Sequence, residues 1–227
     1  MRTTKPLTVG LILMLLLSAG TVFADVSPLS GLTAEWWQVV GSIPTPVNPG
    51  LDQTGADCMV GQRGPVWFLA GTFFNGATTR TCSVPEGEWL FFPVVNVVNY
   101  NSPNLCGQGS SESVDVLRSV IAPIIDAAAD LSVKVDGQPV NNVVRVKSLA
   151  FAITVPADSV LNAQCIAEGL ETLPAAVYSP AVDDGFYTLL SPLSKGKHTV
   201  HIQGQIPLFG LTVDVTYNLT IVPVLLQ

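Results

Sequence analysis

The sequence predicts a mostly β protein: an antiparallel β-sandwich or jelly-roll-like fold with one amphipathic helix at about 111–129. Short β-branched and aromatic runs recur between turns rich in Gly and Pro, which is typical of such folds. Only one segment shows helical periodicity, so strands and helices do not alternate as they would around a parallel sheet. Hydrophobic residues make up 48% of the chain, which is enough for a sizeable core.

The first 24 residues have the layout of a secretory signal peptide. An apolar run over 7–17 follows a positively charged start, and small residues at Val22 and Ala24 predict cleavage before Asp25. The run is shorter than the about 20 residues that a membrane span needs. An uncleaved N-terminal anchor is the alternative.

The mature chain, 25–227, is expected to be a single β-rich domain without a membrane span. Cleavage removes Arg2 and Lys5, which leaves 8 basic and 17 acidic residues and a formal charge of −9. This charge argues against binding to nucleic acid or to anionic lipid, since both need a basic surface. We therefore expect an exported protein, either periplasmic or secreted.

The mature chain begins with an extended, turn-rich stretch over 25–50. Its one apolar block, 35–40, is followed by Pro44 and Pro46, which predict that no long helix forms there. Strand patterns follow at 65–71, 78–84, 89–98, 131–135, 143–146, 149–155, 186–190, 198–203 and 211–221. Residues 156–182 are expected to be irregular.

The one predicted helix begins after Ser111 or Ser113, either of which can cap it. Pro123 lies inside it and predicts a kink or a split into two short helices. Its apolar face consists of Val114, Leu117, Val120, Ile121, Ile124, Ile125 and Ala128.

Four cysteines remain after cleavage, and an even number in an exported chain predicts two disulfides. Of the three possible pairings we favour Cys58–Cys82 with Cys106–Cys165, because the first pair brackets one compact, turn-rich segment. A zinc site is the alternative, but the chain has no C-x-x-C pair.

Several segments of the mature chain have a distinctive sequence: Trp-Trp-Gln at 36–38, Gly-Gln-Arg-Gly-Pro-Val-Trp-Phe-Leu-Ala-Gly at 61–71, Arg-Thr-Cys-Ser-Val-Pro-Glu-Gly-Glu-Trp-Leu-Phe-Phe-Pro-Val at 80–94, and the segments 191–201 and 214–217. In these segments the chain resembles an uncharacterised family of secreted bacterial proteins. The resemblance implies bacterial origin and export. It transfers no activity and no catalytic residue.

Trp36 and Trp37 are the candidate ligand-binding residues, because exposed tryptophans stack on sugar rings. On an extended chain neighbouring side chains point to opposite sides, so we expect at least one of them to be exposed. The alternative is that both cover one end of the sandwich as a hydrophobic plug. Trp67 and Trp89 lie in apolar strands and are expected in the core.

Oxygen-bearing side chains cluster at Asn48, Asp52 and Asp57, which makes this loop a candidate calcium site. Asx turns explain the same residues. The segment 183–185, Asp-Asp-Gly, is a weaker candidate of the same kind. No other cofactor is expected.

His198 and His201 are three residues apart on a predicted strand, which sends them to opposite faces and prevents chelation of one metal. No recognisable nucleophile motif accompanies them. Our hypothesis is therefore an exported, non-catalytic β-sandwich that binds a glycan or a cell-surface or envelope partner. The alternative is a secreted, glycosidase-like hydrolase whose carboxylates, Glu35 among them, are assembled by the fold.

Overall fold

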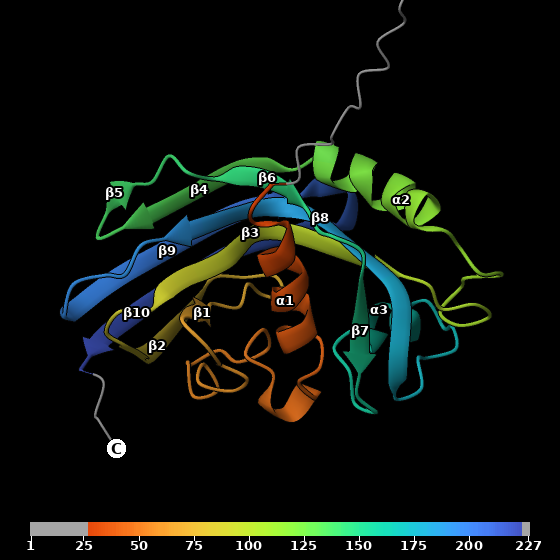
Figure 1. The fold of residues 1–227 in the computed structure, drawn as a ribbon, viewed down its shortest axis with the longest axis horizontal. Coiled ribbons are helices and arrows are strands. Elements are labelled where there is room, and N and C mark those ends of the chain that lie inside the picture. The colour runs from red at the N-terminus through yellow and green to blue at the C-terminus, as the bar shows by residue number, and fades with distance from the viewer. Residues whose placement is uncertain (1–26, 224–227) are drawn as a thin grey trace, which may run out of the picture.

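The computed structural model describes residues 27–223, and Figure 1 shows their arrangement. Within this part of the chain, ten strands form two five-stranded sheets. The first sheet has the order β1 (Val66–Phe68), β3 (Trp89–Tyr100), β8 (Ala176–Leu190), β6 (Val144–Lys147), and β7 (Phe151–Val155) also pairs with β8. The second has the order β2 (Thr78–Pro85), β10 (Leu211–Val222), β9 (Gly196–Ile206), β4 (Ala129–Val135), β5 (Gln138–Pro139). The helices are α1 (Ser30–Val40), α2 (Val114–Asp126) and α3 (Asn162–Ala167), with 3-10 turns η1 (Thr45–Val47) and η2 (Pro207–Phe209).

The predicted mostly β class is confirmed, and the two sheets are compatible with a sandwich. Leu90, Phe92 and Val94 of β3 belong to one buried cluster with Ile202 of β9 and Val215 of β10, so a core lies between the sheets. Both sheets are mixed, however: β1 runs parallel to β3, and β2 runs parallel to β10. The chain switches to the second sheet between β1 and β3, which lets β3 return beside β1 in the same direction.

The helix α1 corrects the prediction of an extended stretch over 25–50. Thr33, Trp36, Trp37 and Val40 follow helical spacing, and all four are buried. Pro44 and Pro46 follow the helix end and only limit how far it extends. The sequence signal was weak because the N-terminal residue of the helix lacks a side-chain cap.

The helix α2 confirms the predicted amphipathic helix, and Ser113 is its cap, with the Ser113 hydroxyl accepting from the Val116 N–H. Leu117 and Ile121 are buried, whereas Val120, expected on the same face, is 50% exposed. The helices α1 and α2 lie below and above the strands in Figure 1. The region 156–182 is more regular than expected, since it contains α3 and the start of β8.

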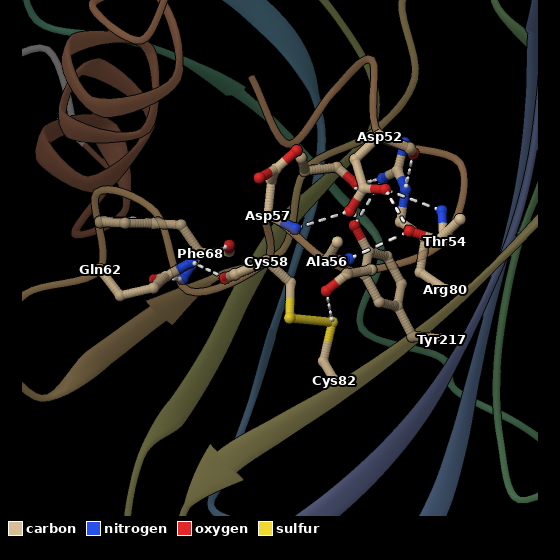
Figure 2. The surroundings of a disulfide bond; sticks show 12 residues. Asp52, Thr54, Ala56, Asp57, Cys58, Gln62, Phe68, Arg80, Cys82 and Tyr217 are labelled. Atoms are coloured by element: carbon tan, nitrogen blue, oxygen red, sulfur yellow. Dashed lines mark hydrogen bonds between the residues drawn. A yellow bond between two sulfur atoms is a disulfide. The ribbon is translucent and has the colours of Figure 1, made fainter. Parts of the chain in front are cut away.

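Both predicted disulfides are present: Cys58–Cys82 and Cys106–Cys165 have Cα–Cα distances of 6.2 and 5.1 Å. Figure 2 shows that Cys58–Cys82 ties an irregular loop to β2, close to Arg80 and Tyr217. With all four cysteines in disulfides, none of them is available as a zinc ligand.

Candidate ligand-binding pocket

The strand β3 has an open edge. Its neighbour β1 pairs only with residues 89–91, so the rest of β3 forms the border of the first sheet. A pocket of about 560 Å³ lies along this border, and we call it the edge pocket. Its walls come from Trp36 and Trp37 of α1, the segment 71–75, residues 93–98 and Tyr100 of β3, residues 160–164, and residues 206–213 of the second sheet. Two sheets, two helices and one loop therefore meet at this site.

The lining of the edge pocket is mainly Val, Leu, Ile, Phe and Trp. Side chains with polar groups are few, and they come from Trp36, Trp37, Thr72, Asn75, Asn96, Tyr100 and Gln164. Burial raises the pKa of Tyr100 to about 12, with a further contribution from Tyr178, so its hydroxyl is neutral at physiological pH. A mostly apolar concavity with a few polar groups is the usual form of a small-molecule site.

Arg80 stabilises the wall of the edge pocket that includes Gly71, through hydrogen bonds from outside the lining. Its Nη1 donates to the carbonyl oxygens of Ala70 and Gly71 at 3.0 and 2.8 Å, and its Nε donates to the Asp52 carbonyl. Nη1 also donates to the Tyr217 hydroxyl, which in turn donates to the Ala70 carbonyl. The buried guanidinium is thereby satisfied by backbone oxygens, and it fixes the loop that enters the pocket wall at Gly71.

The expectation that Trp36 or Trp37 is exposed is wrong. They are only 1% and 3% exposed, because on a helix both rings turn towards the first sheet. Trp36 Nε1 donates to the Leu69 carbonyl at 3.0 Å, and the two rings contact each other edge to face. Both still line the edge pocket, so a role in ligand binding stays a prediction for them.

The two other tryptophans, Trp67 and Trp89, differ in their burial. Trp67 is buried as expected. Trp89 is 42% exposed at the start of β3, so its assignment to the core is wrong. It is the most exposed tryptophan among the described residues.

A buried polar network lies behind the edge pocket and centres on Asp183 of β8. Trp37 Nε1 donates to its Oδ1 at 2.7 Å, and the Tyr187 hydroxyl lies 2.8 Å from both carboxylate oxygens. Burial raises the pKa of Asp183 well above its ordinary range, although the bonds from Tyr187 and Trp37 oppose the shift. The neighbouring Asp184 is paired elsewhere, with Arg145 at 2.8 Å. The two carboxylates of the weaker calcium candidate therefore serve separate partners.

Asn96 of β3 connects this network to the pocket. Its Nδ2 donates to the Tyr187 hydroxyl at 2.9 Å, and its half-buried side chain lines the pocket. Gly185 is its cross-strand partner, and a Cβ there would lie 2.6 Å from the Asn96 Cβ. Because Gly185 has no side chain, there is room for the Asn96 side chain beside it.

The calcium candidates have other partners. Asn48 is buried, donates to the carbonyls of Val40 and Ile43, and does not offer its oxygen outward because Oδ1 accepts from the Gly50 N–H. Asp52 forms the expected Asx turn, in which Oδ1 accepts from Thr54.

Asp52 Oδ2 accepts from the Asp57 N–H (Figure 2). Burial acts to raise the pKa of Asp52, but these hydrogen bonds outweigh it and lower the pKa. Among the described residues no group of three metal-binding side chains is gathered, and calcium at Asn48, Asp52 and Asp57 stays a prediction.

His198 lies in an arrangement that looks like a catalytic triad. Its Nδ1 is 2.7 Å from Asp136 Oδ2, and its Nε2 is 3.2 Å from the Ser194 Oγ. However, Nε2 is closer, at 2.8 Å, to the Ser194 carbonyl oxygen, which can only accept. With this carbonyl as its nearest partner, Nε2 donates and is not placed to take the proton of Ser194, which differs from the geometry of a triad. The bond to Asp136 raises the pKa of His198.

His201 lies apart from this cluster and bonds Asp214 at 2.9 Å. His198 and His201 thus have separate partners, as their spacing predicts. A second pocket of about 420 Å³ lies beside His198, Asp136 and Lys197. Strand side chains such as Thr81 and Asn218 form its other walls.

Comparison of the chain with family models, curated proteins and solved structures finds no match. The resemblance to a secreted bacterial family therefore stays an expectation. Sequence reasoning did not find Asn96 and Tyr187, because their roles depend on the pairing of β3 with β8. Asp183 was considered only as part of the weaker calcium candidate at 183–185, and nothing in the sequence placed Trp37 opposite it.

Proposed function

We propose that the protein is an exported, non-catalytic binding protein that holds an apolar or amphipathic ligand in the edge pocket. The observation that carries the proposal is the pocket itself: about 560 Å³, lined mainly by aliphatic and aromatic side chains at the open border of β3. Apolar area removed from water would supply most of the binding free energy.

The chemistry of the lining favours binding over hydrolysis. Within the described residues, the walls of the edge pocket contain no Asp, Glu, His, Ser or Cys. A glycosidase-like site needs two carboxylates about 5–10 Å apart across a cleft. Asp183 lies behind Trp37 and Tyr187 and is fully buried, so it is not presented to a ligand. Glu35 lies near Arg63 (3.8 Å) and outside the lining.

Export is supported by the two disulfides, since such bonds form and persist in oxidising compartments. The expected signal peptide, 1–24, lies outside the described residues. In the part of the chain that the structure describes, no helix has the length and apolarity of a membrane span. Intact-mass measurement of the exported protein tests this part: we expect Asp25 as the first residue, and a mass that includes residues 1–24 would contradict it.

Binding to a glycan or to a surface partner is the second candidate function, and one observation favours it. Trp89 is 42% exposed, and an exposed tryptophan can stack on a sugar ring. Trp36 and Trp37, in contrast, are buried. A glycan array with wild type and Trp89→Ala tests this candidate, which predicts retention by wild type and its loss in the variant.

The edge pocket is tested by titration of the mature protein with Nile red, a neutral apolar dye. We expect one saturable site in wild type. Leu211→Trp fills the pocket and should abolish this binding, whereas the matched control Leu208→Trp, at an exposed position outside the lining, should bind as wild type does. Ala163→Trp narrows the pocket from exposed α3 and provides a second blocking variant with little risk to folding. Equal binding by all four proteins would contradict the proposal.

A further inference from the structure

The buried network fixes the direction of each hydrogen bond behind the pocket. Trp37 Nε1 can only donate, so the Asp183 oxygen that it contacts accepts. The Tyr187 hydroxyl has one hydrogen, and it donates this hydrogen to the Asp183 carboxyl group 2.8 Å away. The Tyr187 oxygen is then free only to accept, so the Asn96 atom 2.9 Å from it must be the amide nitrogen.

This orientation leaves the Asn96 Oδ1 as the outward-facing end of the amide. Among the described residues none donates to Oδ1, although the side chain is half-buried in the pocket lining. Gly185 and Tyr187 hold the amide from behind, so it cannot turn without losing the bond to Tyr187. A fixed acceptor surrounded by apolar side chains favours a ligand that donates to it.

Three other polar side chains of the lining are engaged at one end within the protein. Thr72 exchanges hydrogen bonds with the backbone of Phe74, and Asn75 Oδ1 accepts from the Thr212 N–H. Gln164 Nε2 donates to Glu168, the residue that follows α3. Tyr100 is neutral. Within the described residues, the walls thus carry no ionised group that could pair with a charged head group, so an anionic ligand would lose its hydration without compensation.

We infer that the edge pocket selects uncharged amphipathic molecules, with Asn96 Oδ1 accepting from a hydroxyl or amide N–H head group and the apolar walls holding the chain. This inference rests on the proposed function, because it assumes that the edge pocket binds apolar ligands. Asn96 is then the specificity residue, and the ligands are long-chain alcohols or primary amides. Fatty carboxylates and ligands without a donor bind more weakly.

The test compares three probes of equal chain length on the mature protein by Nile red displacement: 1-decanol, its methyl ether and decanoate. In wild type we expect 1-decanol to bind about five- to tenfold more tightly than the ether, since one hydrogen bond is worth about 1 kcal/mol. Decanoate should be the weakest. Asn96→Leu should make alcohol and ether equal, whereas the matched control Asn218→Leu, an exposed strand position outside the edge pocket, should keep the wild-type ratio.

The wild-type comparison stands even if Asn96→Leu does not fold, because it needs no variant. Equal affinity of wild type for the alcohol and the ether, with Nile red still displaced, would overturn the inference and leave the proposed function intact. A retained preference in folded Asn96→Leu would overturn it as well. If neither probe displaces the dye, or if the dye does not bind, both proposals fail.

Discussion

The indole N–H of Trp37 on α1 donates to the buried carboxylate of Asp183 on β8 at 2.7 Å, across 146 residues of sequence. This bond ties the helix to the centre of the first sheet. Trp37 lines the edge pocket on its other side, so the same bond sets one pocket wall. The fold and the candidate site therefore depend on one another at this position.

The first prediction concerns Asp183. Asp183→Leu leaves Trp37 Nε1 and the Tyr187 hydroxyl buried without an acceptor, so the free energy of unfolding should fall by about 2–5 kcal/mol. Asp183→Asn keeps an acceptor and should stay within about 1 kcal/mol of wild type at neutral pH. Urea denaturation measures both, and equal loss in the two variants would contradict this role of the carboxylate.

The same residue predicts a pH dependence. Burial raises the pKa of Asp183, so the folded state holds its proton more tightly than the unfolded state. Stability should therefore fall as the pH rises from the unfolded pKa near 3.9 towards the raised folded pKa. The amide in Asp183→Asn does not titrate, so the stability of this variant should not show this decrease with rising pH. An identical pH profile for wild type and Asp183→Asn would be evidence against a raised pKa.

The next prediction concerns Arg80, whose guanidinium bonds four backbone carbonyls and the Tyr217 hydroxyl. Arg80→Met should lower the free energy of unfolding by about 3–5 kcal/mol, because these buried oxygens lose their donors. Tyr217→Phe should cost about 1–2 kcal/mol. A double-mutant cycle measures the coupling between them, and strictly additive losses would show that the 2.6 Å contact contributes nothing.

His198 predicts that stability falls as the pH rises through its range. The bond to Asp136 raises the pKa of His198, so its contribution to stability is present below the unfolded pKa near 6.5 and is lost as the pH rises through the higher folded pKa. Denaturation of His198→Asn between pH 5.5 and about 8.5 should show a flatter profile. Ser194→Ala should keep the wild-type slope, because the Ser194 carbonyl is the closer acceptor; a changed slope there would revive the triad interpretation.

The two disulfides predict unequal losses. In the loop-entropy model, removal of Cys58–Cys82, with a separation of 24 residues, costs about 3.5 kcal/mol, and removal of Cys106–Cys165, with a separation of 59, costs about 4 kcal/mol. Paired Cys→Ser variants and thermal denaturation measure the difference. Alkylation of unreduced wild type should label no cysteine, and any labelled thiol would contradict the pairing.

The strands were the most predictable part of this protein. Alternation and β-branched runs placed β2, β3, β9 and β10 because these signals lie within each segment. The order of strands was not accessible, since β1 joins β3 only after the chain crosses to the other sheet. The helix α1 was missed because Pro44 and Pro46 suggested an extended stretch, although both lie beyond its end.

The candidate site was predictable only in part. Trp36 and Trp37 were singled out for their aromatic character, and both line the pocket, but their burial follows from a helix that was not expected. Asn96 gave no signal, because a lone Asn in a strand acquires meaning only from Tyr187 and Gly185 on the neighbouring strand. Both disulfides were found because the cysteine count and spacing were informative by themselves.

Ligand binding in the edge pocket can be tested most directly by amide chemical-shift mapping of the ¹⁵N-labelled mature protein titrated with 1-decanol. We expect the perturbed amides to cluster in 71–75, 93–100 and 206–213, around the edge pocket, and the Asn96 side-chain amide to shift with them. Perturbations that are absent, spread over the surface, or centred on Trp89 would contradict the edge pocket as the binding site.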